Sequence, residues 1–217
     1  MSPADSGIGK RRRAALEIGS EEYAARREEL VRVAATVFKE KGYEAATLND
    51  IAERFGADRA SLYYYVASKE ELFQDAVRGV LETNLKAAER ILRGKGSAEA
   101  KLAALIEQVI GSYDENYPHT YLYIQEDMRQ VASDETPWAQ DMTRQTKRIE
   151  SITIKLIAQG VEEGTFRDDI RPELAANALW GMLNWTHRWY RPGRQITSAE
   201  MAKGFSAIFF EGLVKRR

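Results

Sequence analysis

The 217-residue sequence contains no cysteine, only two histidines and only five prolines. Without cysteine there is no disulfide bond, no thiolate metal site and no cysteine nucleophile, so a disulfide-stabilised secreted fold is excluded. With His119 and His187 as the only histidines, a histidine-rich metal site is not expected either. The sequence therefore predicts neither a metal nor a cofactor, and its lack of thiol chemistry is typical of the reducing cytoplasm.

Long apolar runs are also missing. Nowhere do eighteen apolar residues follow one another, and the basic block at residues 10–13 has no apolar segment behind it. A transmembrane helix needs about 20 such residues, and a secretory signal needs an apolar segment after its charges. We therefore expect a cytoplasmic protein without a membrane partner.

Neither sign of charge is in clear excess, because the sequence contains 32 lysines and arginines and 33 aspartates and glutamates. Proteins that coat nucleic acid by bulk electrostatics are usually basic, so this balance argues against such a protein. The charges are segregated, however: residues 1–13 and 215–217 each carry +3, and the segment between them holds 25 basic and 32 acidic residues. An acidic body suppresses indiscriminate adhesion to DNA, so any affinity must come from a few placed residues.

Good helix formers dominate the stretches between the prolines, and strand-like alternation is absent apart from residues 121–124. An all-α fold is therefore predicted, with three short N-terminal helices, a connecting fourth helix from residue 68 to about 92, and further helices at 97–116, 119–133, 137–163, 172–190 and 197–214. The expected organisation is a basic, disordered N-terminal arm (1–20), a helix-turn-helix DNA-binding domain (21–67) and an effector-binding and dimerisation domain (68–217).

Two short helices around Gly56 and Ala57 form a candidate helix-turn-helix, with Thr47 and Asp58 as their N-caps. In this motif the second helix lies in the major groove, although helical hairpins with a glycine turn are also common. Leu62, Tyr65 and Val66 are assigned to the core. The surface that remains holds a cation suited to guanine, short side chains and two hydroxyls that can reach phosphate, namely Arg59, Ala60, Ser61, Tyr63 and Tyr64.

The run TLNDIAERFGADRASLYYYVASKEEL, residues 47–72, closely resembles the DNA-binding domain of TetR-family transcriptional repressors, and the match covers about residues 30–78. This resemblance implies a repressor that binds a palindromic operator as a homodimer. It places Asp58 at the head of the recognition helix, where an acid would repel phosphate, so we interpret Asp58 as a cap. The positions that commonly touch DNA in this family are Thr47, Asn49, Arg59, Ser61, Tyr63, Tyr64 and Lys69.

Four cations, Lys10 to Arg13, precede the first helix. Such a run is either a solubilising tail or an arm that follows the DNA backbone or enters the minor groove. In the last two predicted helices, apolar stripes with small residues at their centre resemble the helices that form the TetR-family dimer bundle. Ordinary intramolecular core is the alternative for both stripes.

Aromatic residues are dense between the DNA-binding unit and these last helices, which favours a pocket for a bulky, mostly apolar molecule. Residues 184–192 resemble TetR-type repressors of fatty-acid and sterol breakdown, some of which respond to acyl-CoA thioesters. An acyl-CoA needs cations near the pocket mouth, whereas a cationic aromatic drug favours carboxylates such as Glu126, Asp127 or Asp141. The candidate ligand-binding residues are Tyr113, Tyr117, Tyr121, Gln125, Arg144, Arg148, Trp180, Asn184, Trp185, Arg188 and Trp189.

Enzyme motifs are not found in the sequence. It contains no Gly-x-Ser-x-Gly elbow, no Walker motif and no dinucleotide fingerprint, and neither histidine has a recognisable triad context. We therefore expect no catalytic residues, and an enzyme or a purely structural helical adaptor is a minor alternative to a ligand-responsive repressor.

Overall fold

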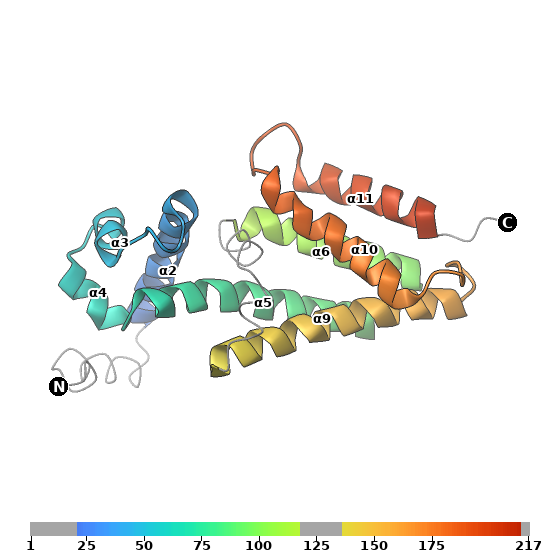
Figure 1. Ribbon diagram of the computed structural model, residues 1–217, viewed down its shortest axis with the longest axis horizontal. Helices are drawn as coiled ribbons and strands as arrows, with labels where there is room; N and C mark the ends of the chain where they lie inside the picture. Colours follow the sequence, from blue (N-terminus) through green and yellow to red (C-terminus); the bar gives the residue numbers. More distant parts are fainter. Residues whose placement is uncertain (1–20, 118–135, 214–217) are drawn as a thin grey trace. The chain divides into compact units, whose positions relative to one another are not determined.

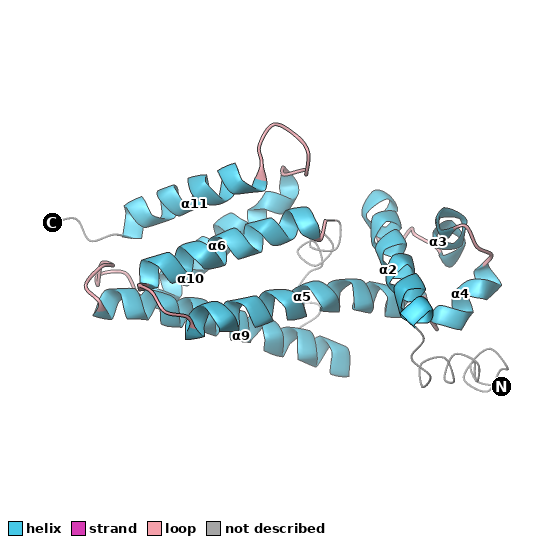
Figure 2. Cartoon of the chain, turned by 180° about the vertical axis from the view of Figure 1, so that it is seen from behind, coloured by secondary structure: helices cyan, strands magenta, loops and turns pink. Residues whose placement is uncertain are grey.

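The computed structural model describes residues 21–117 and 136–213. All of its elements are helices (Figures 1 and 2), and no strand occurs within these two ranges, so the all-α prediction is confirmed. In chain order they are α2 (Glu21–Lys41), α3 (Leu48–Phe55), α4 (Arg59–Tyr65), α5 (Lys69–Arg93), α6 (Ala98–Glu115), α9 (Pro137–Glu162), α10 (Pro172–Trp185), the 3-10 turn η2 (Thr186–Arg188) and α11 (Ser198–Leu213).

Most predicted helix ends lie within two residues of the observed ones, but the prediction that one helix spans residues 172–190 is wrong. Helix α10 stops at Trp185, because local bonds then replace the α-helical ladder. The hydroxyl of Thr186 (2.6 Å) and its N–H both donate to the carbonyl of Leu183, and the N–H of Trp189 donates to the carbonyl of Thr186 (3.1 Å), so these backbone bonds span three residues instead of four. The predicted helix at 119–133 lies outside the described residues.

Local side-chain caps fix the two short helices, as their sequence predicts. The Thr47 hydroxyl accepts from the N–H of Asp50 (3.2 Å), whose carboxylate in turn accepts from the N–H of Thr47 (2.9 Å). Gly56 ends α3 at φ +74°, in the left-handed region that glycine adopts without strain. Asp58 caps α4 by accepting from the N–H of Ser61 (2.7 Å), so its interpretation as an N-cap is confirmed.

The pKa of the Asp50 carboxyl is lowered to about 2 by hydrogen bonds from the Lys41 ammonium and from the hydroxyl and N–H of Thr47. A lowered pKa stabilises the fold above the unfolded value of about 4, and this contribution disappears as the pH falls through the folded value. Asp50→Asn is therefore expected to lower the urea-unfolding midpoint at neutral pH, with the difference from the wild type shrinking between about pH 4 and pH 2. Circular dichroism during urea titration at several pH values measures this.

Glu53→Gln serves as the control for that titration, because Glu53 is exposed on the same helix. Its difference from the wild type should not follow the same pH course. If the Asp50→Asn midpoint stayed below the wild-type midpoint by the same amount at every pH, the ionised carboxylate would not be the source of the stabilisation.

The chain divides into two compact units between Gly79 and Val80, within α5. In the first unit, α2, α3, α4 and the first turns of α5 share a core. The predicted boundary between residues 67 and 68 coincides with the turn before α5, and as a functional division it stays a prediction. Fully buried side chains of this core include Leu30, Phe38, Ile51, Leu62 and Leu72.

The second unit is built around α6, which contacts α9, α10 and α11. Its core is mainly aliphatic, with four buried aromatic side chains, Tyr113, Phe166, Tyr190 and Phe209, of which the first two are the most deeply buried. Gly160 on α9 lies against the Phe166 ring so closely that an added Cβ would stand 2.1 Å from it, which explains a glycine within this helix. None of the described helices combines the length and the hydropathy that crossing a membrane requires.

Candidate functional site

The helix-turn-helix of the first unit consists of α3, the turn at Gly56 and α4. Leu62 is fully buried and anchors α4, whereas Arg59, Ala60 and Ser61 at its N-terminal end are exposed. The Arg59 guanidinium donates to the Tyr63 hydroxyl one turn later (3.2 Å) and lies 5.9 Å from the Tyr63 ring centroid. The structure thus presents one tethered cation at the start of α4, as a base contact in the major groove requires.

The three tyrosines of α4 differ in their surroundings. Tyr65, which the sequence assigns to the core, is only partly buried, and it stacks on Tyr23 of α2 with ring centroids 5.3 Å apart. Tyr64 is also partly buried and meets the same ring edge-on at 5.4 Å. Tyr63 contacts Arg59, whereas Tyr64 and Tyr65 pack α4 against α2 through Tyr23.

Two further predicted DNA contacts, Thr47 and Asn49, lie at the start of α3. Thr47 is exposed, but its hydroxyl both donates to Asp50 (2.8 Å) and accepts from its N–H in the cap. Asn49 is exposed on the first turn of α3. These two positions, like those on α4, stay predictions as DNA contacts.

Lys69 has a structural role that the sequence did not indicate. Its ammonium lies 2.8, 3.3 and 3.1 Å from the carbonyl oxygens of Tyr43, Glu44 and Ala46, in the turn between α2 and α3. An ammonium has three N–H donors, and these carbonyls occupy them. In this conformation Lys69 connects the turn to the start of α5, and the predicted contact with DNA would require its ammonium to leave these acceptors.

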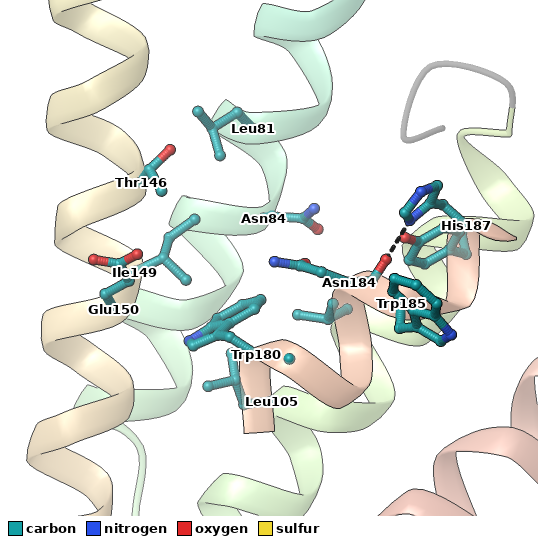
Figure 3. Close-up of a pocket in the computed structure, with 13 residues that line it drawn as sticks. Leu81, Asn84, Leu105, Thr146, Ile149, Glu150, Trp180, Asn184, Trp185 and His187 are labelled. Atoms are coloured by element: carbon teal, nitrogen blue, oxygen red, sulfur yellow. Dashed lines mark hydrogen bonds between the residues drawn. The ribbon is translucent and has the colours of Figure 1, made fainter. Parts of the chain in front are cut away.

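A cavity of about 500 Å³ lies in the second unit (Figure 3). Four of the predicted ligand-binding residues line it: Tyr113, Trp180, Asn184 and Trp185. The other lining residues are Leu81, Asn84, Leu105, Val109, Thr146, Ile149, Glu150, Gly181 and His187.

The cavity wall is mainly apolar, with polar groups at separate points. Trp180 from α10 donates to the Thr153 hydroxyl on α9 (3.3 Å), which fixes the indole as one wall. Asn84 from α5 and Asn184 from α10 reach toward the same space (Figure 3). Burial raises the pKa of the Tyr113 hydroxyl to about 12, so this group keeps its proton at neutral pH. Such a cavity suits a bulky apolar body with few polar substituents.

Five predicted ligand-binding residues do not line the cavity: Tyr117, Arg144, Arg148, Arg188 and Trp189. Arg144 pairs with Asp141 of its own helix, and the Arg148 Nε lies 3.3 Å from the Glu89 carboxylate of α5. Arg188 lies next to the wall instead, with its guanidinium 5.0 Å from the ring centroid of Trp185. Tyr121 and Gln125 lie outside the described residues.

The sequence alone could not identify Glu150 and Asn84 as cavity residues, because their place depends on which faces of α5 and α9 meet. Periodicity shows that a helix has an apolar face, but it does not show which helix covers that face.

Within residues 21–117 and 136–213, no group of three or more histidines or carboxylates could hold a metal ion.

Apolar side chains also lie exposed on α10 and α11. Leu174 and Trp185 are 62% and 60% exposed, and Ala178 and Gly181 lie between them at helical spacing on the same face of α10. On α11, Ile208 is 64% exposed. Faces of this kind on a regular helix mark interaction sites.

Comparison with known proteins identifies the family. Residues 30–76 match the bacterial regulatory proteins of the tetR family, and residues 95–213 match the tetracyclin repressor-like C-terminal domain. The HTH-type transcriptional repressor KstR2 of Rhodococcus jostii is 30% identical over 211 residues, which cover 97% of this chain and 96% of the relative. KstR2 of Mycobacterium tuberculosis is 28% identical over 191 residues, 88% and 94% of the two chains.

Solved structures agree with these sequence matches. The structure of the ketosteroid transcriptional regulator KstR2 of Mycobacterium tuberculosis gives a TM-score of 0.82 at 28% identity and covers 88% of this chain and 96% of that one. AibR in complex with isovaleryl coenzyme A and operator DNA gives a TM-score of 0.72, covering 85% and 98%, but at 18% identity it shows the fold alone. The chain belongs to the TetR family and is a transcriptional repressor, not an enzyme.

Proposed function

We propose that this repressor binds a palindromic operator as a homodimer and is released from it by a bulky apolar effector, most simply an acyl-CoA thioester. The observation that carries the proposal is that the candidate operator surface and the cavity belong to different units. Arg59 stands exposed at the start of the recognition helix α4, and a mainly apolar cavity of about 500 Å³ lies in the other unit. Operator and effector therefore have distinct sites, as a released repressor requires.

The class of effector is supported by the relatives and by the chemistry of the cavity. Relatives at 28–30% identity bear the name KstR2, and one of them is described as a ketosteroid regulator. A fused-ring or acyl body fits the apolar wall, and Arg188 beside Trp185 offers a cation for a phosphate group of coenzyme A.

A homodimer is supported by the exposed apolar face of α10 and by the family. A second copy that packs its own α10 and α11 against these helices would cover Leu174, Trp185 and Ile208 in a two-fold arrangement. Two recognition helices would then read the two halves of a palindrome.

A second candidate effector is a cationic aromatic drug. It is favoured by one observation: Glu150 lines the cavity together with Trp180, so a carboxylate and an aromatic face are both available to a cation. Glu126 and Asp127, which the sequence suggested for this role, lie outside the described residues, and Asp141 pairs with Arg144 instead.

The two effector classes can be separated by titration. Operator duplexes are first selected from random DNA, and release is then followed by fluorescence anisotropy with coenzyme A thioesters of increasing ring and chain size. At saturation, a thioester is expected to lower operator affinity by about 5- to 150-fold, the usual range of allosteric coupling. Free coenzyme A and tetraphenylphosphonium, an aromatic cation that does not intercalate into DNA, are the comparison ligands.

Matched variants decide between the classes. Arg188→Gln should weaken release by a thioester and leave release by tetraphenylphosphonium unchanged, whereas Glu150→Gln should do the reverse. If tetraphenylphosphonium released the protein and every thioester failed, the drug sensor would replace the thioester sensor. Failure of both classes to alter operator affinity would contradict the proposed cavity effector while leaving operator binding intact.

A further inference from the structure

The recognition helix α4 is short, and few of its own side chains are buried. It spans the seven residues Arg59–Tyr65, and Leu62 is the one side chain within that span that is fully buried. Helices of this length are not stable on their own, so contacts from other elements must set their position. The side chains that reach α4 therefore decide where its exposed Arg59 points.

Tyr23, in the first turn of α2, makes one such set of contacts. Its ring is buried between those of Tyr64 and Tyr65, at 5.4 and 5.3 Å between centroids. Its hydroxyl lies 3.4 and 3.5 Å from the carbonyl oxygens of the same two residues. These carbonyls end α4 and have no partner within the helix, so Tyr23 holds the C-terminal end of the recognition helix.

Arg27, one turn further along α2, makes the second set. Its guanidinium is only partly exposed and pairs with two carboxylates of α5, those of Glu71 (3.2 Å) and Asp75. Glu71 also accepts from the N–H of Ala67 (2.7 Å), in the turn that joins α4 to α5. These two ion pairs thus link α2 to the start of α5, and through Glu71 to the segment that follows the recognition helix.

We propose that Tyr23 and Arg27 are positioning residues for operator reading: through the α4 carbonyls and through Glu71 they set the recognition helix, and neither touches DNA itself. The inference rests on the proposed function in one respect, that α4 reads the operator. Base contacts tolerate displacements of only about half an ångström. Weakening the contacts of Tyr23 and Arg27 should therefore lower affinity for the specific operator more than affinity for DNA of any other sequence.

The test replaces Arg27 by methionine, which keeps the length of the apolar stem and removes the ion pairs. Affinity for the selected duplex is expected to fall about tenfold, as if one good base contact were lost. Affinity for a scrambled duplex of the same composition is expected to stay within twofold of the wild type. Both are measured by fluorescence anisotropy of the full-length chain.

The dependence of affinity on salt separates a positioning residue from a contact. Each phosphate contact adds about 0.9 to the slope of log affinity against log salt, so losing one per subunit would flatten the slope by about 1.8 in a dimer. Arg27→Met should leave the slope unchanged. A flattened slope, or an equal loss on both duplexes, would overturn the proposal because Arg27 would then contact the backbone. Full retention of specific affinity would overturn it as well.

Arg32→Met is the matched control, since it removes the same charge from the same helix. Arg32 is exposed and has no ion-pair partner among the residues that the structure describes. Arg32→Met should not lower affinity for the selected duplex relative to the scrambled duplex, whereas Arg27→Met should.

Milder variants guard against unfolding. Tyr23→Phe removes only the hydroxyl, and Glu71→Gln keeps an acceptor for Ala67 but not the charge. Each should reduce the ratio of specific to scrambled affinity about threefold without lowering the unfolding temperature by more than a few degrees. If both left the ratio unchanged, the proposal would be overturned. If the wild type itself bound no selected duplex, the proposed function would fail instead, which keeps the two failures distinguishable.

Discussion

Arg59→Ala is expected to lower affinity for the selected operator at least about 30-fold while the protein remains folded and dimeric. Arg59 is exposed at the start of α4, and its guanidinium is tethered to Tyr63 rather than to an acid (3.2 Å), so it remains available as a donor to guanine. A bidentate contact to guanine contributes about 1–3 kcal/mol, and a dimer loses two of them, which corresponds to at least a 30-fold loss. Anisotropy with the selected and scrambled duplexes measures it.

The control for Arg59→Ala is Arg90→Ala, which removes an exposed cation from the second unit. It should bind the selected duplex like the wild type. Tyr63→Phe adds a finer comparison, because it removes the acceptor that holds Arg59 and should relax discrimination at the base pair that Arg59 reads. Retention of full discrimination by Arg59→Ala would rule out its role in base recognition.

Ala178→Arg is expected to convert the dimer into monomers and, as a consequence, to remove high-affinity operator binding. Ala178 is exposed at the centre of the apolar face that includes Leu174 and Trp185. An arginine there extends freely into solvent in a monomer, but in a packed dimer it would be an unpaired buried charge costing at least about 3 kcal/mol. The dimer dissociation constant should therefore rise more than 100-fold.

Sedimentation velocity over a concentration series measures this change. Ala100→Arg introduces the same side chain at an exposed position of α6 and should leave the dimer intact. The circular dichroism of both variants should match that of the wild type. A dimer that persisted in Ala178→Arg at nanomolar concentration would show that this face of α10 is not the subunit interface.

The parts of the fold that were predictable from the sequence depend on local interactions. Thr47 and Asp58 cap helices that begin at the very next residue, and Gly56 ends α3 through its own backbone conformation. Each of these signals involves residues within four positions of one another, and that is the range over which sequence patterns carry direct information.

Contacts between distant segments were not predictable in the same way. The sequence predicts Lys69 as a DNA contact, but its ammonium donates to three backbone carbonyls that lie about 25 residues earlier in the chain. Tyr65 fits an apolar stripe, but Tyr23 of another helix decides how deeply it is buried. The aromatic residues suggested a pocket, whereas Asn84 and Glu150 entered it only through the packing of α5 and α9 in three dimensions.

The distribution of tryptophans gives the protein its own optical reporters. Trp185 is 60% exposed and Trp189 44%, so in a single chain both indoles meet water and should emit at long wavelength. Trp180 instead stands in the cavity wall with its N–H bonded to Thr153. Subunit association should shift the emission of the exposed indoles to shorter wavelength, and Trp189 reports it alone because Trp185 also lines the cavity. Occupancy of the cavity should instead quench Trp180 and Trp185. Association and effector binding therefore change different features of the emission, its wavelength and its intensity, and both can be followed without a label in one unmodified sample.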